Sequence, residues 1–163
     1  LLDYIQLQAR DAVFYKIDRG GDITYHGPGQ LVGYPIFDLE EMKLGLRDYI
    51  HLLEEAIIMC ISRFGIEGSR LEGATGVWID PDKGARARKM CAIGVRASRF
   101  VTMHGFALNV STDLSYFNHI NPCGFTDKGV TSIEKETGRK SSMEDVKRVM
   151  YNTMREVFGY EYY

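Results

Sequence analysis

The sequence predicts an α+β fold, in which several strand-like segments follow one another and two long helices interrupt them. Residues 74–79, 90–97 and 100–110 are three consecutive strand-like segments, which predict an antiparallel meander. Residues 46–64 carry the apolar period of a helix, and a second helix is expected after Ser141. Because strands and helices do not alternate strictly, we expect α+β and not a series of βαβ units.

The first half of the chain predicts two strands and one helix. Residues 13–17 and 31–37 alternate apolar with polar side chains and are rich in β-branched and aromatic residues, as strands are. From Leu46 the apolar residues recur at spacings of three and four, which is the stripe of an amphipathic helix, and Gly65 is expected to end it. A glycine-rich run, residues 19–30, lies between the two strands.

The second half predicts the meander and a closing helix. The Pro-Asp-Lys-Gly turn of residues 81–84 and a corner at residues 98–99 separate the three strands. Ser141 and Glu144 form a capping-box pattern, and the apolar residues after them predict a helix that ends at Gly159.

Length and composition predict one soluble domain, residues 1–163, that needs no metal or disulfide for its core. The net charge of -2 provides no basic surface for a nucleic acid, and no apolar run approaches the ~20 residues of a membrane span. The three cysteines form no CxxC pair, which argues against a zinc site and for a reducing compartment. We expect a cytoplasmic protein, with a mitochondrial or plastid matrix as the alternative.

The run RGGDITYHGPGQ at residues 19–30 predicts a binding surface. Four glycines in twelve residues are more than a connecting loop needs, because glycine serves where the backbone must take a positive φ or approach another group closely. The run could cradle a phosphate, but it lacks GxxxxGK[ST] and precedes a strand instead of a helix. A carbonyl or acyl group is therefore the favoured ligand.

Cys123 is the best candidate for a nucleophile. It stands in a tight Asn-Pro-Cys-Gly turn, where its sulfur could be exposed. Attack by the thiolate near neutral pH requires a neighbour that lowers the thiol pKa from about 8.5, and Lys89 could be that neighbour. From spacing alone the favoured reading of Lys89 is a solvated cation in a basic cluster with Arg86 and Arg88, and Cys123 could be a buried small hydrophobe. Cys91 is a weaker rival nucleophile, whereas Cys60 falls on the apolar helix stripe and is expected in the core.

Two histidines and two glycines in strand-like segments also merit interpretation. His26 and His104 each precede a glycine, and they could orient hydrogen bonds or pack in the core. Without a spacing such as HExxH, a zinc site has little support. Gly94 and Gly105 would let a ligand or a backbone approach closely, or they could mark β-bulges.

Four motifs together resemble the octanoyltransferases of lipoate biosynthesis, also called lipoyl(octanoyl) transferases, in the biotin and lipoate protein ligase superfamily. They are RGGDITYHGPGQ, the Lys-x-x-Ala-Ile-Gly of residues 89–94, HGFALNV at residues 104–110 and NPCG at residues 121–124. The resemblance covers residues 14–133 and implies a sandwich-like fold whose mixed, largely antiparallel sheet, flanked by helices, forms an acyl tunnel. The family's earlier His-Pro-x-Val-Tyr-Thr-x-Gly segment has no counterpart here. Either the sequence starts after that segment, which is the expectation we favour, or part of the pocket is built differently.

The same resemblance implies the chemistry of the site. Cys123 would carry an acyl thioester, while Lys89 would lower its pKa and act as acid and base. Substrate contacts would come from three segments: Arg19, Gly20, Gly21, Asp22, Ile23, Thr24, Tyr25 and His26; Ala92, Ile93 and Gly94; and Gly105, Phe106 and Ala107.

The implied reaction moves an octanoyl group from octanoyl-acyl carrier protein to a lysine of a lipoyl domain, without a nucleotide or other cofactor. The acceptors would be lipoyl domains of 2-oxoacid dehydrogenase complexes and the glycine cleavage H protein. The alternatives are an ATP-dependent lipoate or biotin protein ligase, an amidotransferase that moves octanoyl between lipoylated-type proteins, and a non-catalytic domain that only binds a carrier protein.

Overall fold

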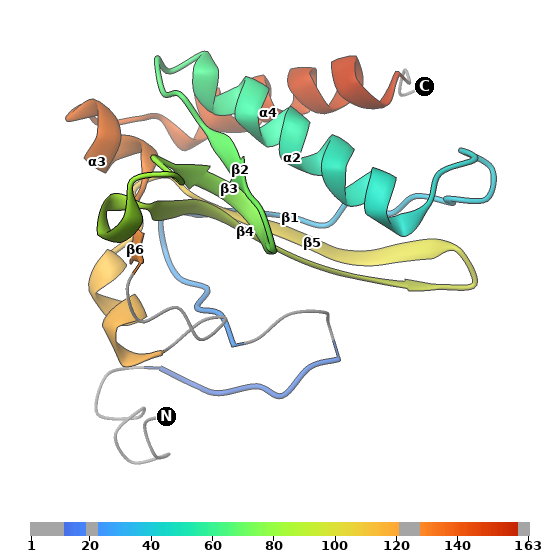
Figure 1. Ribbon diagram of the computed structural model, residues 1–163, viewed down its shortest axis with the longest axis horizontal. Coiled ribbons are helices and arrows are strands. Elements are labelled where there is room, and N and C mark those ends of the chain that lie inside the picture. The colour runs from blue at the N-terminus through green and yellow to red at the C-terminus, as the bar shows by residue number, and fades with distance from the viewer. Residues whose placement is uncertain (1–11, 19–22, 121–127, 160–163) are drawn as a thin grey trace.

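The computed structural model describes residues 12–18, 23–120 and 128–159, and in these the chain forms a sheet with two long helices over one face (Figure 1). The strands are β1 (Gln30–Gly33), β2 (Ser69–Leu71), β3 (Ala74–Ile79), β4 (Arg88–Ser98), β5 (Val101–Asn109) and β6 (Gly129–Val130). The α-helices are α2 (Leu46–Ser62), α3 (Ile133–Thr137) and α4 (Met143–Phe158), and 3-10 turns span Gly84–Arg86 and Leu114–His119.

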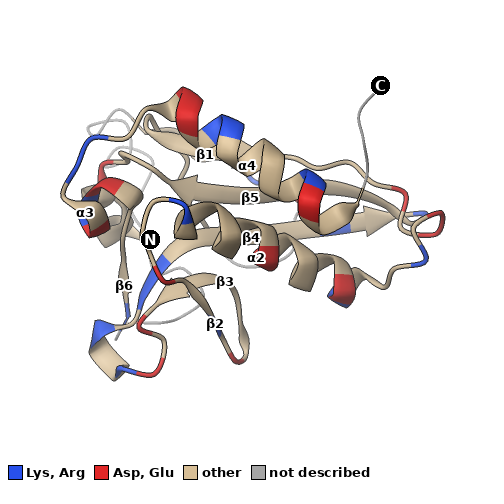
Figure 2. Ribbon diagram, turned by 90° about the horizontal axis from the view of Figure 1, so that it is seen from above, with Lys and Arg blue, Asp and Glu red and all other residues tan. Residues whose placement is uncertain are grey.

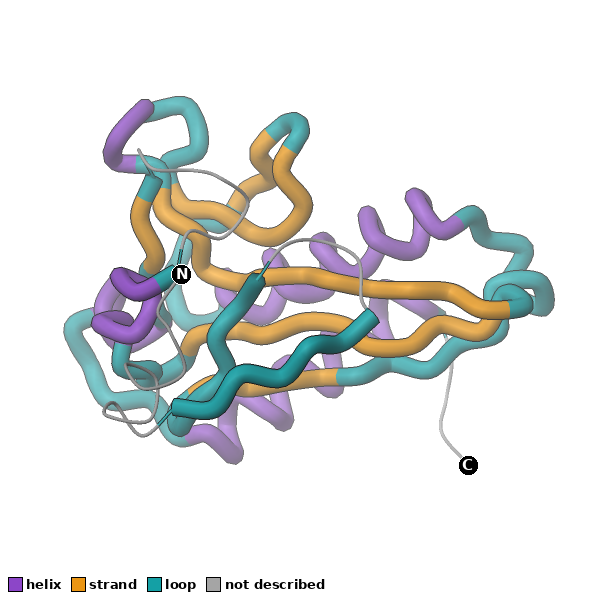
Figure 3. Tube along the Cα trace, turned by 90° about the horizontal axis from the view of Figure 1, so that it is seen from below, coloured by secondary structure: helices purple, strands orange, loops and turns teal. Residues whose placement is uncertain are grey.

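The sheet confirms the predicted fold class. Its strands run in the order β1-β5-β4-β3-β2, and all of these neighbours are antiparallel. The short strand β6 pairs in parallel with β4, so the sheet is mixed but largely antiparallel. The predicted meander corresponds to β3, β4 and β5, of which β4 and β5 form the long central hairpin (Figure 3).

Helices α2 and α4 cover the sheet because each buries one apolar stripe. Tyr49, Leu53, Ile57 and Ile61 of α2 are fully buried in one hydrophobic cluster with the inward side chains of the sheet. The two helices lie side by side in the view from above (Figure 2). No helix in the described part of the chain is long and apolar enough to cross a membrane.

The ends of both long helices differ slightly from the predictions. Ser142, not Ser141, is the N-cap of α4, and its hydroxyl accepts a hydrogen bond from the backbone N–H of Asp145. Gly159 caps the C-terminus in the left-handed conformation, as expected. Helix α2 ends at Ser62, three residues before Gly65, because the next residues form tight turns.

Two strand predictions in the first half are wrong or too long. Residues 13–17 form no strand; Val13, Phe14 and Tyr15 are more than half exposed, so the apolar alternation does not mark a buried face. Strand β1 stops at Gly33 instead of continuing to residue 37. Beyond it the chain is held by Thr102, whose hydroxyl accepts from the Phe37 N–H, and whose N–H donates to the Phe37 carbonyl.

Candidate active site

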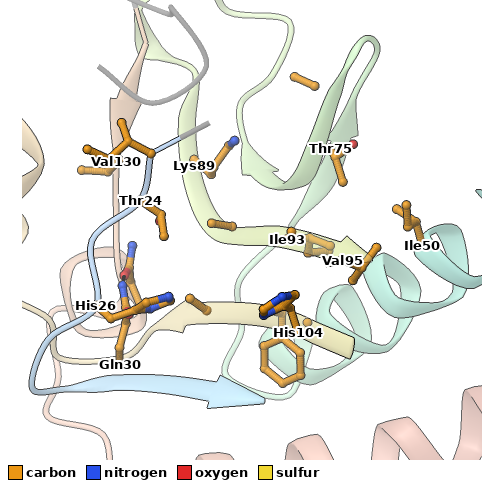
Figure 4. Close-up of a pocket in the computed structure, with 18 of the residues that line it drawn as sticks. Thr24, His26, Gln30, Ile50, Thr75, Lys89, Ile93, Val95, His104 and Val130 are labelled. Atoms are coloured by element: carbon orange, nitrogen blue, oxygen red, sulfur yellow. Dashed lines mark hydrogen bonds between the residues drawn. The ribbon is translucent and has the colours of Figure 1, made fainter. Parts of the chain in front are cut away.

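A cavity of about 370 Å³ lies against β4 and β5. Residues 12–18 and 23–29 cross the face of the sheet that points away from α2 and α4 (Figures 1 and 3). Side chains from these segments, from the turn between β2 and β3, and from the 3-10 turn Leu114–His119 complete its walls. In the close-up, Lys89 lies at one end of the cavity and Ile50 and Val95 lie at the other (Figure 4).

Most of the described residues that the sequence predicted as a site line this cavity together. They are Lys89, Ala92, Ile93 and Gly94 of β4, Gly105, Phe106 and Ala107 of β5, and Ile23, Thr24 and His26. Tyr25 does not line it: its ring stacks on Tyr116 at 4.8 Å and meets Phe117 edge-on at 5.4 Å. Arg19, Gly20, Gly21, Asp22 and Cys123 lie outside the described residues.

A β-bulge turns Lys89 toward the cavity. Across β3 and β4, Val77 faces Cys91 and the next residue, Trp78, faces Lys89, so Met90 is an extra residue in β4. Met90 and Cys91 are both fully buried. Without the bulge, Lys89 would share the core-facing side of Cys91, because side chains alternate along a strand. With it, Lys89 lines the cavity with Ala92 and Gly94.

The register between β3 and β4 begins at Val77, and at the preceding residue, Gly76, the β3 backbone passes close to the Cys91 carbonyl of β4. Gly76 has a φ of +124°, and a Cβ there would lie 2.5 Å from the carbonyl oxygen of Cys91. Its N–H donates to the buried carboxylate of Glu54 on α2 at 2.9 Å. Arg70 donates to the same carboxylate at 3.1 Å, so the buried charge is paired. Gly73, Ala74 and Thr75 then line the cavity.

Small residues shape the part of the sheet that the cavity covers. Ala92 pairs with Ala107, and Gly94 pairs with Gly105, in an unbroken register. These glycines are therefore not bulges. A Cβ on Gly105 would lie 2.2 Å from the carbonyl oxygen of Gly33, so β1 can approach β5 only because residue 105 is glycine.

His26 belongs to a chain of hydrogen bonds that the sequence did not reveal. The side-chain N–H₂ of Gln30 donates to the Tyr25 carbonyl at 3.1 Å and to Asn109 Oδ1 at 2.9 Å, which leaves Oε1 as an acceptor. His26 Nδ1, 3.0 Å from that oxygen, is therefore the donor, and in the neutral ring Nε2 is left as an acceptor. Asn109 in turn donates to the Thr131 carbonyl at 3.0 Å. Gln30 is the last residue of one motif and Asn109 the next-to-last residue of another, which is the only sequence signal for them.

His104 occupies a strained position beside the cavity. Its φ is +62°, which is uncommon for a residue with a side chain. Its Nε2 is buried, and within the described residues it has no hydrogen-bond partner. Asp18 Oδ1 lies 3.6 Å from this nitrogen. Asp18 also pairs with Arg96.

The described cysteines are core residues. Cys60 and Cys91 are fully buried, and burial raises the pKa of the Cys60 thiol to about 12. Burial likewise raises the pKa of Cys91, because the thiolate would lose its hydration. Cys91 is therefore a poor rival nucleophile, although it stands two residues from Lys89.

Two neighbouring basic residues, Arg88 and Lys89, have different surroundings: Arg88 forms ion pairs, and Lys89 lines the cavity. Arg88 forms a two-pronged ion pair with Glu136, both bonds at 2.6 Å, and binds Asp80 at 2.7 Å. The Arg88 guanidinium lowers the pKa of Glu136. Lys89, in contrast, is half-buried at the cavity, which argues against its being a solvated surface cation. Within the described ranges no three His, Cys, Asp or Glu residues are grouped as metal ligands.

Both the sequence and the fold have relatives among known proteins. The sequence matches the lipoyl protein ligase A/B catalytic domain family over residues 1–155. It is 62% identical over 153 residues to an octanoyltransferase of Parabacteroides distasonis, covering 94% of this chain and 69% of that protein. It is 58% identical over 159 residues to an octanoyltransferase of Porphyromonas gingivalis, covering 98% of this chain but 32% of that one.

The fold is shared with more distant proteins of known structure. A bi-partite lipoate protein ligase from Thermoplasma acidophilum superposes with a TM-score of 0.71 at 15% sequence identity, over 99% of this chain and 64% of that one. At this identity the likeness concerns the fold alone. The chain thus spans between about a third and about two thirds of the length of these proteins.

Proposed function

Because the chain belongs to the lipoyl protein ligase A/B catalytic domain family, we propose that it transfers an octanoyl group from a carrier-protein thioester to the target lysine of a lipoyl domain. The observation that carries the proposal is that residues from three separate motifs, Lys89 among them, line one cavity. The acyltransferase class is further supported by relatives, 52% to 62% identical, that are named octanoyltransferase.

Cys123 is the proposed nucleophile. The two described cysteines are buried in the core, which leaves Cys123 as the remaining thiol of the chain. Phe117 and Val130, which flank the NPCG turn in sequence, both line the cavity, and Val130 pairs with Lys89 across β4 and β6. A lysine ammonium near the thiol would favour the thiolate and thus the attacking form of the cysteine.

The reaction would proceed in two steps, an exchange between thioesters and then formation of an amide from the new thioester. The Cys123 thiolate attacks the carbonyl carbon of the octanoyl thioester, the bond from that carbon to the carrier sulfur breaks, and the carrier thiolate takes a proton from Lys89. The lipoyl-domain amine then attacks the new thioester, an amide forms, and the neutral Lys89 amine accepts the proton that the attacking amine loses. The Cys123 thiolate is restored, and ping-pong kinetics follow.

The walls of the cavity suit an acyl chain. Ala92, Gly94 and Ala107 have small or no side chains, which leaves space above the sheet. Ile17, Ile23 and Phe117 line the same cavity and supply apolar area. Each methylene buried there contributes about 0.8 kcal/mol to binding. His26, with Nε2 free to accept, lies on the same wall as Gln30 (Figure 4).

The choice of donor separates this proposal from a ligase. An ATP-dependent lipoate or biotin protein ligase would form an acyl adenylate and would need no thiolate. The purified protein should therefore octanoylate a lipoyl domain with octanoyl-acyl carrier protein as the donor, and should fail with free octanoate and ATP. The reverse result would establish a ligase. Binding of either protein without any product would indicate a non-catalytic domain.

The same assay tests the partners. A lipoyl domain of a 2-oxoacid dehydrogenase and the glycine cleavage H protein should both serve as acceptors. Replacement of the carrier-protein donor by an octanoylated H protein distinguishes the amidotransferase variety, which shares the same residues. Bacterial relatives of this kind favour the cytoplasm as the location, and that location stays a prediction.

A further inference from the structure

Trp78, the single tryptophan of the chain, is placed against Lys89 by the sheet itself. The two residues face each other across β3 and β4, next to the bulge at Met90. The indole is 2% exposed, and its Nε1–H donates to the Ala74 carbonyl at 3.1 Å. The ring is therefore held both by packing and by a hydrogen bond at its polar edge.

The Lys89 ammonium lies over the face of this ring, with Nζ 4.7 Å from the ring centroid. A cation within about 6 Å of an indole face is attracted by the electron density of the ring, and more strongly when water is excluded. We propose that Trp78 is a positioning residue, which holds the Lys89 ammonium at the cavity wall by the face of its ring. This inference depends on the proposed role of Lys89 in acyl transfer.

The charged side chains of Glu54 and Arg88, on the elements next to Lys89, have binding partners of their own. Glu54 reaches from α2, but its carboxylate binds Arg70 and the N–H of Gly76. Arg88, the preceding residue, is held by Glu136 and Asp80. Cys91 is buried on the core side of β4, and His26 lies across the cavity on the segment before β1. An aromatic face attracts the ammonium without neutralising it, which leaves its charge available to a thiolate.

Gly76 borders the same side chain. A Cβ at this position would lie 3.6 Å from Lys89 Cε, which is ordinary van der Waals contact, so the lysine side chain passes directly beside Gly76. The bulge and the indole therefore define the course of the Lys89 side chain along β3.

Fluorescence tests the contact without any assay of activity. Because the chain has one tryptophan, emission excited beyond the absorption of tyrosine reports Trp78 alone. Lys89→Met should change the intensity and the maximum of that emission in the folded protein. Lys83→Met is the matched control, because Lys83 is exposed and pairs with Asp80, and it should leave the emission unchanged. Identical spectra for the wild type and Lys89→Met would overturn the contact.

The functional part is tested by Trp78→Phe and Trp78→Leu, compared at equal folded fraction by circular dichroism. Phenylalanine keeps a ring face and should keep the rate of cysteine acylation within about threefold, whereas leucine should lower it by about tenfold or more. In Trp78→Leu the alkaline limb of the pH profile should also move down by about half to one pH unit, because the ring favours the charged amine. Equal rates and equal profiles for the two variants would refute the positioning role.

The two proposals can fail separately. If the wild-type protein never acylates its cysteine, the proposed function is wrong, while the fluorescence result still decides whether Lys89 lies over Trp78. If acylation occurs but Trp78→Leu matches Trp78→Phe, the function stands and the positioning role is wrong.

Discussion

The substitution Gly76→Ala should destabilise the protein more than replacement of an ordinary glycine with a positive φ by alanine does. At a φ of +124°, an alanine is strained by about 1 to 3 kcal/mol. Its Cβ would also lie 2.5 Å from the Cys91 carbonyl oxygen, and relieving such a clash costs a further ~1 to 3 kcal/mol. We therefore expect a loss of about 3 kcal/mol in the free energy of unfolding, together with displacement of Lys89.

Gly73 on the same hairpin is the matched control. It also has a positive φ, +75°, but nothing lies within 4 Å of the Cβ position. Gly73→Ala should therefore cost only the left-handed strain, about 1 kcal/mol. Urea unfolding followed by circular dichroism measures both variants, and the melting temperatures should differ by about 4 to 8 °C. Equal stabilities would refute the argument that the close approach of β3 to the Cys91 carbonyl requires a glycine at position 76.

Three further predictions concern charge, strain and the buried thiol. Hydrogen bonds from Lys83 and Arg88 lower the pKa of Asp80 to about 2, and Arg88 lowers the pKa of Glu136. These carboxylates therefore stabilise the fold above their unfolded pKa of about 4, and the stabilisation is lost as the pH falls through the lower folded pKa. Urea midpoints measured from pH 6 to pH 2 should fall less steeply in Glu136→Gln than in the wild type, and parallel curves would contradict this. His104→Val should lower the free energy of unfolding by about 1 to 2 kcal/mol more than His104→Asn, because a β-branched residue tolerates the φ of +62° poorly. Calorimetry measures the stability of both variants, and equal stabilities would refute the strain argument. Cys91→Ala should still form the octanoyl-cysteine, because the Cys91 thiol is buried and uncharged. The mass of the intact protein shows the adduct, and its loss in a folded variant would make Cys91 the nucleophile.

The sequence predicts those parts of the fold that depend on local patterns. The stripe from Leu46 gives α2, the alternating segments give β3, β4 and β5, and Gly159 ends α4. The alternation at residues 13–17 misleads, because period-two alternation says nothing about whether a partner strand is present. The two-residue strand β6 is too short to leave any period in the sequence.

The composition of the site is predictable, but its geometry is not. Motifs bring Lys89, Ala92 and Gly105 to notice, and they do line one cavity. The bulge at Met90 cannot be read from the sequence, since the four apolar residues after Lys89 have no alternation that an extra residue would interrupt. The bulge nevertheless decides which way Lys89 points. The bond from the Gly76 N–H to Glu54 joins residues 22 positions apart, and no local pattern encodes it.

The central claim is that Lys89 enables Cys123 to hold an acyl group. Mass spectrometry of the protein after incubation with octanoyl-acyl carrier protein tests it directly, with the adduct located by peptide mapping. We expect one octanoyl group on Cys123 in the wild type and in Cys91→Ala, none in Cys123→Ala, and strongly slowed formation in Lys89→Met. An adduct on another residue, or one formed at the same rate without the Lys89 amine, would contradict the account.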